Sequence, residues 1–156
     1  SSIILKRSRL RLRKCLFLKM RICGVSPDAP FAPFRRPLAE SRIALITTSA
    51  PPGDWSDDRP PRKEVWSCRV ADAPESLYNR NLAWDKETTH TRDRESYLPI
   101  LAMSALAERG VIGGLAERFH GVPTVYSQRE TMDADAPNIL GRIVADHADA
   151  ALLVPL

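Results

Sequence analysis

SRIALITT, residues 41–48, is a nearly continuous apolar run of strand length with several β-branched side chains. The turn-forming residues SAPPG, 49–53, end it. A run of this kind is typical of a strand that is buried on both faces, as in a parallel sheet covered by helices. This stretch therefore predicts an α/β fold with a buried strand near its centre.

The C-terminal part of the chain supplies the helix and strand that such a sheet needs. Residues 130–146 carry apolar side chains at helical spacing, with Pro137 expected in the first turn or at a kink. The segment ADAALLVPL, 148–156, follows at once and is typical of a buried strand. Since a helix followed by a buried strand is half of a βαβ unit, we expect a mostly parallel sheet with flanking helices, incomplete as the N-terminal half of a larger domain.

The most regular helix pattern lies between these two strands. Leu98-Pro99 precedes residues 100–107, whose apolar side chains share one helical face, and Gly110 follows as a C-terminal cap. Residues 66–70 alternate apolar and polar side chains and predict a short strand. For residues 115–120 the pattern predicts either a helical turn or a short strand.

Composition and charge limit the classes of function. The chain has 156 residues, 44% hydrophobic and 27% charged, which suits one ordinary globular domain and disfavours a disordered, collagen-like or membrane-bundle protein. Eight of its 23 Lys and Arg residues lie within residues 1–22, where there is no acid. The remainder has 15 basic and 19 acidic residues, so the body is mildly acidic and we expect no nucleic-acid partner.

The basic N-terminal tail is treated apart from the domain. We expect residues 1–25 to be disordered or not native, for example upstream sequence translated from a misplaced start, and residues 26–156 to form the α/β part. The apolar runs of the tail are too short for a signal peptide or a membrane span, so we expect no membrane partner. Binding of nucleic acid or of a membrane surface by this tail is the alternative.

Cysteine and histidine usage points to no metal site. The three cysteines form no C-x-x-C pair, and the three histidines show no metal-ligand spacing with them. An odd number of cysteines without an export signal fits reduced thiols, so we expect a cytoplasmic protein.

Five side chains are candidates for substrate binding: Thr47, Thr48, His90, Arg118 and His120. Thr47 and Thr48 end the first strand, on the same edge as Leu156 if the strands are parallel, where their hydroxyls either face a substrate or cap the next turn. His90 is either a proton donor or a solvated loop histidine. Arg118 and His120 either bind a carboxylate, which a guanidinium can hold with two hydrogen bonds, or form an exposed pair at a helix end.

Four stretches occur in a recognisable order. They are PFAPF with RPL at 30–38, SRIALITT at 41–48, GVIG at 110–113, and DAP leading to DAALLVP at 135–155. Together they resemble the selenoprotein B family of glycine, sarcosine, betaine and D-proline reductases. The likeness covers about residues 30–156.

The resemblance implies an enzyme that cleaves a carbon–nitrogen bond reductively. A small amino-acid or amine substrate would be held as an imine on a pyruvoyl group of a partner subunit, and other reductase subunits would be its partners. A selenolate or thiolate would attack the activated carbon, because this chemistry needs a soft nucleophile of low pKa.

The nucleophile that the family implies is missing from this chain. It would stand just after the strand that here ends at Val154-Pro155-Leu156, followed shortly by a second cysteine. We therefore expect residues 1–156 alone to be inactive, and a UGA selenocysteine codon read as a stop would explain the missing residue. The alternative is a non-catalytic α/β binding or interaction domain.

Overall fold

The computed structural model describes residues 3–5, 32–52, 64–79, 85, 90–125 and 127–156. The strands are β1 (Ile3–Leu5), β2 (Arg42–Thr47), β3 (Trp66–Arg69), β4 (Gly114–Leu115), β5 (Arg118–Gly121) and β6 (Ala150–Val154). The α-helices are α2 (Ile100–Glu108), α3 (Gln128–Glu130) and α4 (Ala136–Ala145). The rest of the predicted basic tail lies outside the described residues.

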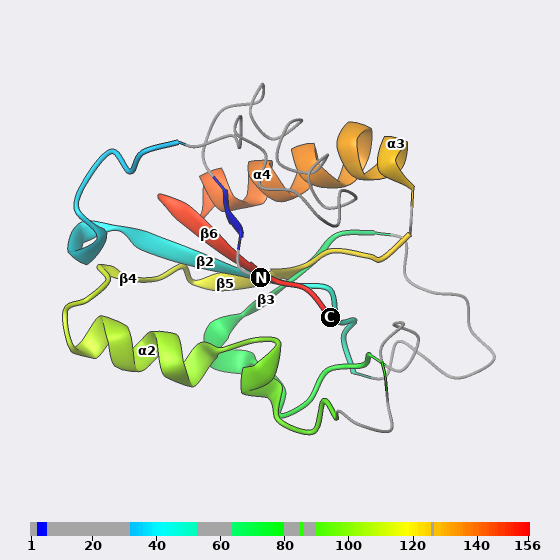
Figure 1. Cartoon of the computed structure of the whole chain (residues 1–156), viewed down its shortest axis with the longest axis horizontal. Coiled ribbons are helices and arrows are strands. Elements are labelled where there is room, and N and C mark those ends of the chain that lie inside the picture. Colours follow the sequence, from blue (N-terminus) through cyan, green and yellow to red (C-terminus); the bar gives the residue numbers. More distant parts are fainter. Residues whose placement is uncertain (1–2, 6–31, 53–63, 80–84, 86–89, 126) are drawn as a thin grey trace.

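The strands form one mixed sheet in the order β1-β6-β2-β5-β3 (Figure 1). The central strands β6, β2 and β5 are parallel, and the edge strands β1 and β3 pair antiparallel. β4 pairs parallel with the start of β2, and β5 pairs parallel with the end of β2. β4 and β5 therefore occupy one strand position beside β2. The expected α/β fold with a mostly parallel sheet and flanking helices is confirmed.

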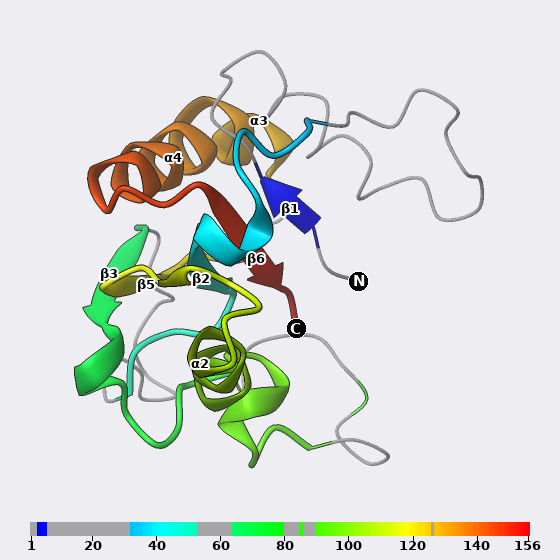
Figure 2. The same ribbon diagram turned by 90° about the vertical axis from the view of Figure 1, so that its left-hand side faces the viewer.

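Helices α2 and α4 cover opposite faces of the sheet (Figure 2). Residues Ile43 to Thr47 of β2 are all buried, as the continuous apolar run predicts. Ala44 and Ile46 pack in the core under α4, together with Ile139 and Ile143 of that helix. Their neighbours in β2 face the α2 side, where Leu45 packs with Tyr97, Leu98 and Phe119.

The chain winds around β2 in both directions. From β2 it passes through α2 to β5 on one side, and from β5 it passes through α4 to β6 on the other side of β2. The two crossover helices therefore lie on opposite faces. In open α/β sheets, ligands bind in the crevice at the carboxyl ends of the strands where the winding direction changes, which here is the junction of β2 and β6.

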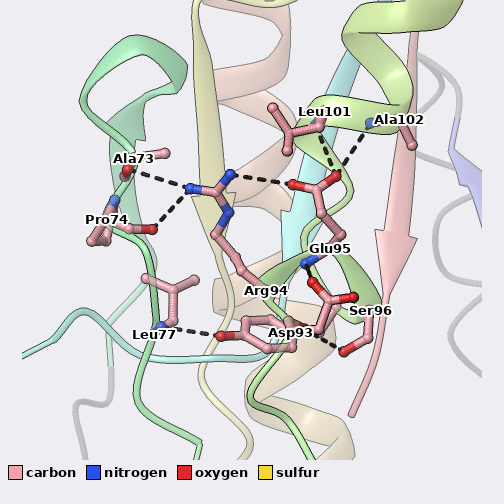
Figure 3. A network of polar contacts seen from close by, with 10 residues as sticks. Ala73, Pro74, Leu77, Asp93, Arg94, Glu95, Ser96, Leu101 and Ala102 are labelled. Carbon is pink, nitrogen blue, oxygen red and sulfur yellow. Dashed lines mark hydrogen bonds and ion pairs between the residues drawn. The ribbon is translucent and has the colours of Figure 1, made fainter.

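The α2 helix is tied to the sheet by a group of charged and main-chain contacts (Figure 3). Glu95 accepts hydrogen bonds from the amides of Leu101 and Ala102 in the first turn of α2, at 2.8 and 3.2 Å. Arg94 forms an ion pair with Glu95 at 3.2 Å and donates to the carbonyl of Pro74 at 3.0 Å. We call Arg94, Glu95 and these backbone partners the Glu95 network. It satisfies amide groups that every helix N-terminus leaves free.

The predicted helix ends have local causes. Gly110 follows α2 with a φ of 69°, the left-handed conformation expected of a C-terminal cap. The second helix starts earlier than predicted, because the hydroxyl of Ser127 accepts the amide of Glu130 and caps α3. A π-helical turn, Thr131–Asp135, then joins α3 to α4, and Pro137 lies at the start of α4. The position predicted for Pro137 is therefore confirmed.

The remaining strands follow the sequence pattern closely. β3 and β6 lie within the segments predicted as strands, and the two options left for residues 115–120 are resolved in favour of a strand. β5 ends at Gly121, which lies under the ring of Trp66. A Cβ atom at that position would stand 1.8 Å from the indole nitrogen, so only glycine allows this approach.

Candidate functional site

The carboxyl ends of β2 and β6 form the first candidate region. Thr47 is opposite Val154 in the parallel ladder, and the backbone amide of Leu156 donates to the hydroxyl of Thr48 at 3.0 Å. The expectation that Thr47 and Thr48 lie on the same edge as Leu156 is confirmed. We call this region the carboxyl edge.

The two threonine hydroxyls have backbone partners at this edge. Thr47 is fully buried, and its Oγ1 accepts from the amide of Ser49 at 3.2 Å. Thr48 is half-buried and holds Leu156. Both contacts are those of strand-end caps. Binding of a substrate by these hydroxyls stays a prediction.

Three buried polar atoms near the carboxyl edge have no hydrogen-bond partner in the described structure: Ser49 Oγ, Thr124 Oγ1 and Asp135 Oδ2. Ser49 follows β2, and Thr124 and Asp135 follow β5. Burial, and after it the charge of Glu130, raises the pKa of Asp135. Buried polar groups are nearly always hydrogen-bonded, and the described residues do not supply a partner for these three atoms.

Arg118 and His120 belong to a second region, on the face of β5 that α4 covers. They lie on a strand and not at an exposed helix end, and His120 is fully buried. The guanidinium of Arg118 donates from Nε and Nη2 to the carboxylate of Asp146, at 2.9 and 2.5 Å. Arg118 thus holds a carboxylate with two hydrogen bonds, as its chemistry predicts, but this carboxylate is the protein's own.

His120 connects this ion pair to the edge strand β3. Its Nδ1 is 2.8 Å from the hydroxyl of Ser67. Its Nε2 is 3.2 Å from Asp146 Oδ2, a contact that is not aligned as a hydrogen bond and is an ion pair only when the ring is protonated. Arg142 of α4 donates to Ser67 Oγ at 2.6 Å and to the carbonyl of Val65 at 3.0 Å. We call the side chains of Ser67, Arg118, His120, Arg142 and Asp146 the polar seam.

Burial, more than the charges of the polar seam, keeps His120 neutral. Burial lowers the pKa of His120 to about 4, against the opposing charge of Asp146, and the guanidinium groups of Arg118 and Arg142 lower it further. The neutral ring shares one hydrogen bond with the hydroxyl of Ser67, in which the tautomer of His120 decides which group donates. The hydroxyl of Ser67 also accepts from Arg142.

Sequence reasoning missed three members of the polar seam. Ser67 is 53 residues from His120, and Asp146 is 28 residues from Arg118, so no local spacing joins them. The one usable signal is the pair Arg142 and Asp146, four residues apart on a predicted helix and therefore on one face of it.

His90 stands apart from the other candidates. It is exposed, one residue before Thr91, whose hydroxyl donates to Asn79 at 2.9 Å. The contacts in the described parts of the chain do not bring it together with the other four candidate residues. Its role as a proton donor stays a prediction.

Neither a metal-binding cluster nor a membrane-spanning helix occurs among the described residues. They hold no group of three or more His, Cys, Asp or Glu side chains arranged to bind a metal ion. Among the helices formed by these same residues, none has the length and apolar character needed to cross a lipid bilayer.

The topology defines an α/β protein with a mixed, mostly parallel sheet and flanking helices, whose two crossovers run to opposite sides of β2. No model of a known protein family matches the chain, and no curated protein or solved structure is significantly similar to it. The particular function therefore has to be argued from the motifs and from the site.

Proposed function

We propose that this chain is the N-terminal α/β part of a selenoprotein B-like subunit of the glycine, sarcosine, betaine and D-proline reductases, and that the complete subunit cleaves a carbon–nitrogen bond reductively. The support is the order of the stretches at residues 30–38, 41–48, 110–113 and 135–155, which resembles that of the family.

The contact between Thr48 and Leu156 is the structural observation that favours this function most. A selenocysteine or cysteine just after Leu156 would stand beside Thr48, at the junction of β2 and β6 where the winding changes direction. Such a nucleophile would lie in the part of the fold where α/β enzymes bind their ligands.

Cys68 is a poor substitute for this nucleophile. It lies on the edge strand β3, which β5 and β2 separate from β6. Burial, and after it the charge of Asp72, raises the pKa of its thiol, so the reactive thiolate is disfavoured. The proposal therefore assigns the attack to a residue that follows Leu156.

The remaining components would come from outside this chain. A dithiol would supply the electrons, other reductase subunits would be the partners, and one of them would carry the pyruvoyl group; no residue of this chain is assigned to hold that group. The substrate would be a small amino acid or amine. A reaction that needs free thiolates suits a reducing compartment, for which the cytoplasm is the natural choice.

The decisive test is the nucleotide sequence after the Leu156 codon, together with the intact mass of the native protein. We expect UGA, followed in frame by a nearby cysteine codon and further α/β sequence, and a native mass above 17.4 kDa. Changing that UGA to a cysteine codon should give an extended product, and changing it to UAA should not. An ordinary stop codon, or unrelated sequence after it, would contradict the proposal.

The second candidate is a non-catalytic α/β binding or interaction domain. The capping contacts of Thr47 and Thr48 favour it, because both hydroxyls already serve the fold. It predicts an ordinary stop codon and a stable, folded product of 156 residues. Dithiol-dependent amine reduction by residues 1–156 alone would contradict both candidates, since the first places the nucleophile after Leu156 and the second has no catalytic activity.

A further inference from the structure

The polar seam joins three elements that are far apart in the sequence. Ser67 belongs to β3, Arg118 and His120 to β5, and Arg142 and Asp146 to the end of α4. The bond from Arg142 to the carbonyl of Val65 adds a main-chain contact just before β3. The position of α4 over this half of the sheet thus depends on polar contacts as well as on the apolar core.

His120 is the one member of the seam whose charge changes between neutral and mildly acidic pH. Arg118 and Asp146 face it from β5 and from the C-terminal end of α4, and Arg142 adds a second guanidinium from α4. β3 presents to it only the uncharged hydroxyl of Ser67, and β2 presents Ile46, its apolar neighbour in the parallel ladder. With His120 neutral, the seam holds two cations and one anion.

A proton on His120 would make it a third cation in a fully buried place. The one carboxylate is already held by Arg118, and the hydroxyl of Ser67 already accepts from Arg142, so the protonated ring would gain no carboxylate of its own. A buried charge without a partner is costly, so the protonated ring favours any state in which water reaches the seam.

We propose that the polar seam is an acid-sensitive latch: when His120 takes up a proton, the last turn of α4 and the edge strand β3 separate from β5, while β2 and β6 stay paired. This property does not depend on the proposed reductase function.

The opening is local because the elements around the seam are held unequally. β3 is a short edge strand with a neighbour on one side only. β2 and β6 share a five-residue parallel ladder in the centre of the sheet. Short edge elements with few neighbours open at lower free energy than central strands.

Amide hydrogen exchange tests the latch on the full chain. Protection factors, corrected for intrinsic exchange rates, would be compared at about pH 7 and about pH 4.5. We expect protection of the amides of residues 67–69 and 145–148 to fall by about tenfold or more, and at pH 4.5 to lie well below that of residues 44–46, which exchange only through global unfolding. Equal protection in all three regions at pH 4.5, or no fall near the seam, would overturn the proposal.

A matched set of variants assigns the effect to one ring. His120→Asn keeps an acceptor for Ser67 but cannot titrate, so the difference between the two pH values should shrink to less than about twofold. His90→Gln and His147→Asn remove exposed histidines and should leave the difference unchanged; asparagine is chosen at position 147 because it tolerates a positive φ. Acid-induced opening that persists in His120→Asn would refute the latch.

If His120→Asn does not fold, NMR titration of the wild-type rings decides. We expect the ring of His120 to titrate well below pH 6.5, over the same pH range in which protection near the seam is lost. Titration of this ring near pH 6.5, or opening at a different pH, would equally overturn the proposal.

Discussion

The Glu95 network and the polar seam fasten helices to opposite faces of one sheet with different chemistry. In the Glu95 network, an Arg–Glu pair acts mainly on main-chain groups, namely the amides at the start of α2 and the carbonyl of Pro74. The polar seam links side chains to one another, and its centre is a fully buried histidine. The Glu95 network acts on backbone groups, whereas the seam surrounds a buried ring that is neutral at neutral pH.

The largest effect is expected from removing the one anion of the seam. Asp146→Asn removes the partner of Arg118, whose side chain is 38% exposed and therefore partly screened by water, so we expect the free energy of unfolding at neutral pH to fall by about 2 kcal/mol. Urea denaturation measures it. The matched control is Asp72→Asn, which breaks an exposed pair with Arg69 and should cost less than about 0.5 kcal/mol. Equal losses in the two variants would show that the seam adds no stability.

The pH dependence of stability sharpens the contrast. The folded chain lowers the pKa of His120 to about 4 from an ordinary value near 6.5, so between these values the unfolded chain binds the extra proton. Stability from this group is complete above pH 6.5 and is lost as pH falls toward 4. We expect His120 to account for a loss of about 2 kcal/mol between pH 7 and pH 5. Urea denaturation of wild type and of His120→Asn at both pH values measures the free energy of unfolding of each. The same loss of stability between pH 7 and pH 5 in the two proteins would contradict the prediction.

A smaller effect is expected at the Glu95 network. Glu95→Ala removes the acceptor for two amides at the start of α2, and we expect the free energy of unfolding at pH 7 to fall by about 1 kcal/mol. Glu108→Ala, at the exposed end of the same helix, is the control and should be nearly neutral. Equal losses in the two variants would mean that Glu95 does not stabilise the start of α2.

The smallest effect is expected at the carboxyl edge. Thr48→Val keeps the shape of the side chain but cannot accept from the amide of Leu156, and we expect a loss of about 0.5 to 1 kcal/mol. The solvent exchange of the Leu156 amide should rise at the same time. Unchanged exchange would mean that this hydroxyl does not hold the end of β6.

The fold was predictable where the signal is local. SRIALITT forms the buried central strand, the apolar face of residues 100–107 forms α2, and Gly110 caps it, because strand burial and helix capping follow from neighbouring residues. The π-helical turn was not predicted. Pro137 lies two residues after it, but the hydrogen-bond pattern before a proline depends on how the helix packs.

The candidate site was predictable only in part. Thr47 and Thr48 lie beside Leu156 as expected, since parallel strands bring their carboxyl ends to one edge. Arg118 and His120 were noticed for their chemistry, but their partner Asp146 comes from a helix that folds back over β5. Contacts between distant elements depend on the tertiary fold, and a single sequence carries no direct record of them.

The central place of β2 has a consequence for synthesis of the chain. β2 is translated first among the three parallel strands, yet its neighbour β6 follows 107 residues later, as the separation of Arg42 and Asp149 shows. At ordinary translation rates this interval is roughly 5–20 s, during which an apolar strand lacks at least one of its parallel neighbours. The nascent chain therefore exposes an apolar strand during this interval, and a chaperone that binds residues 41–48 on the ribosome would protect it.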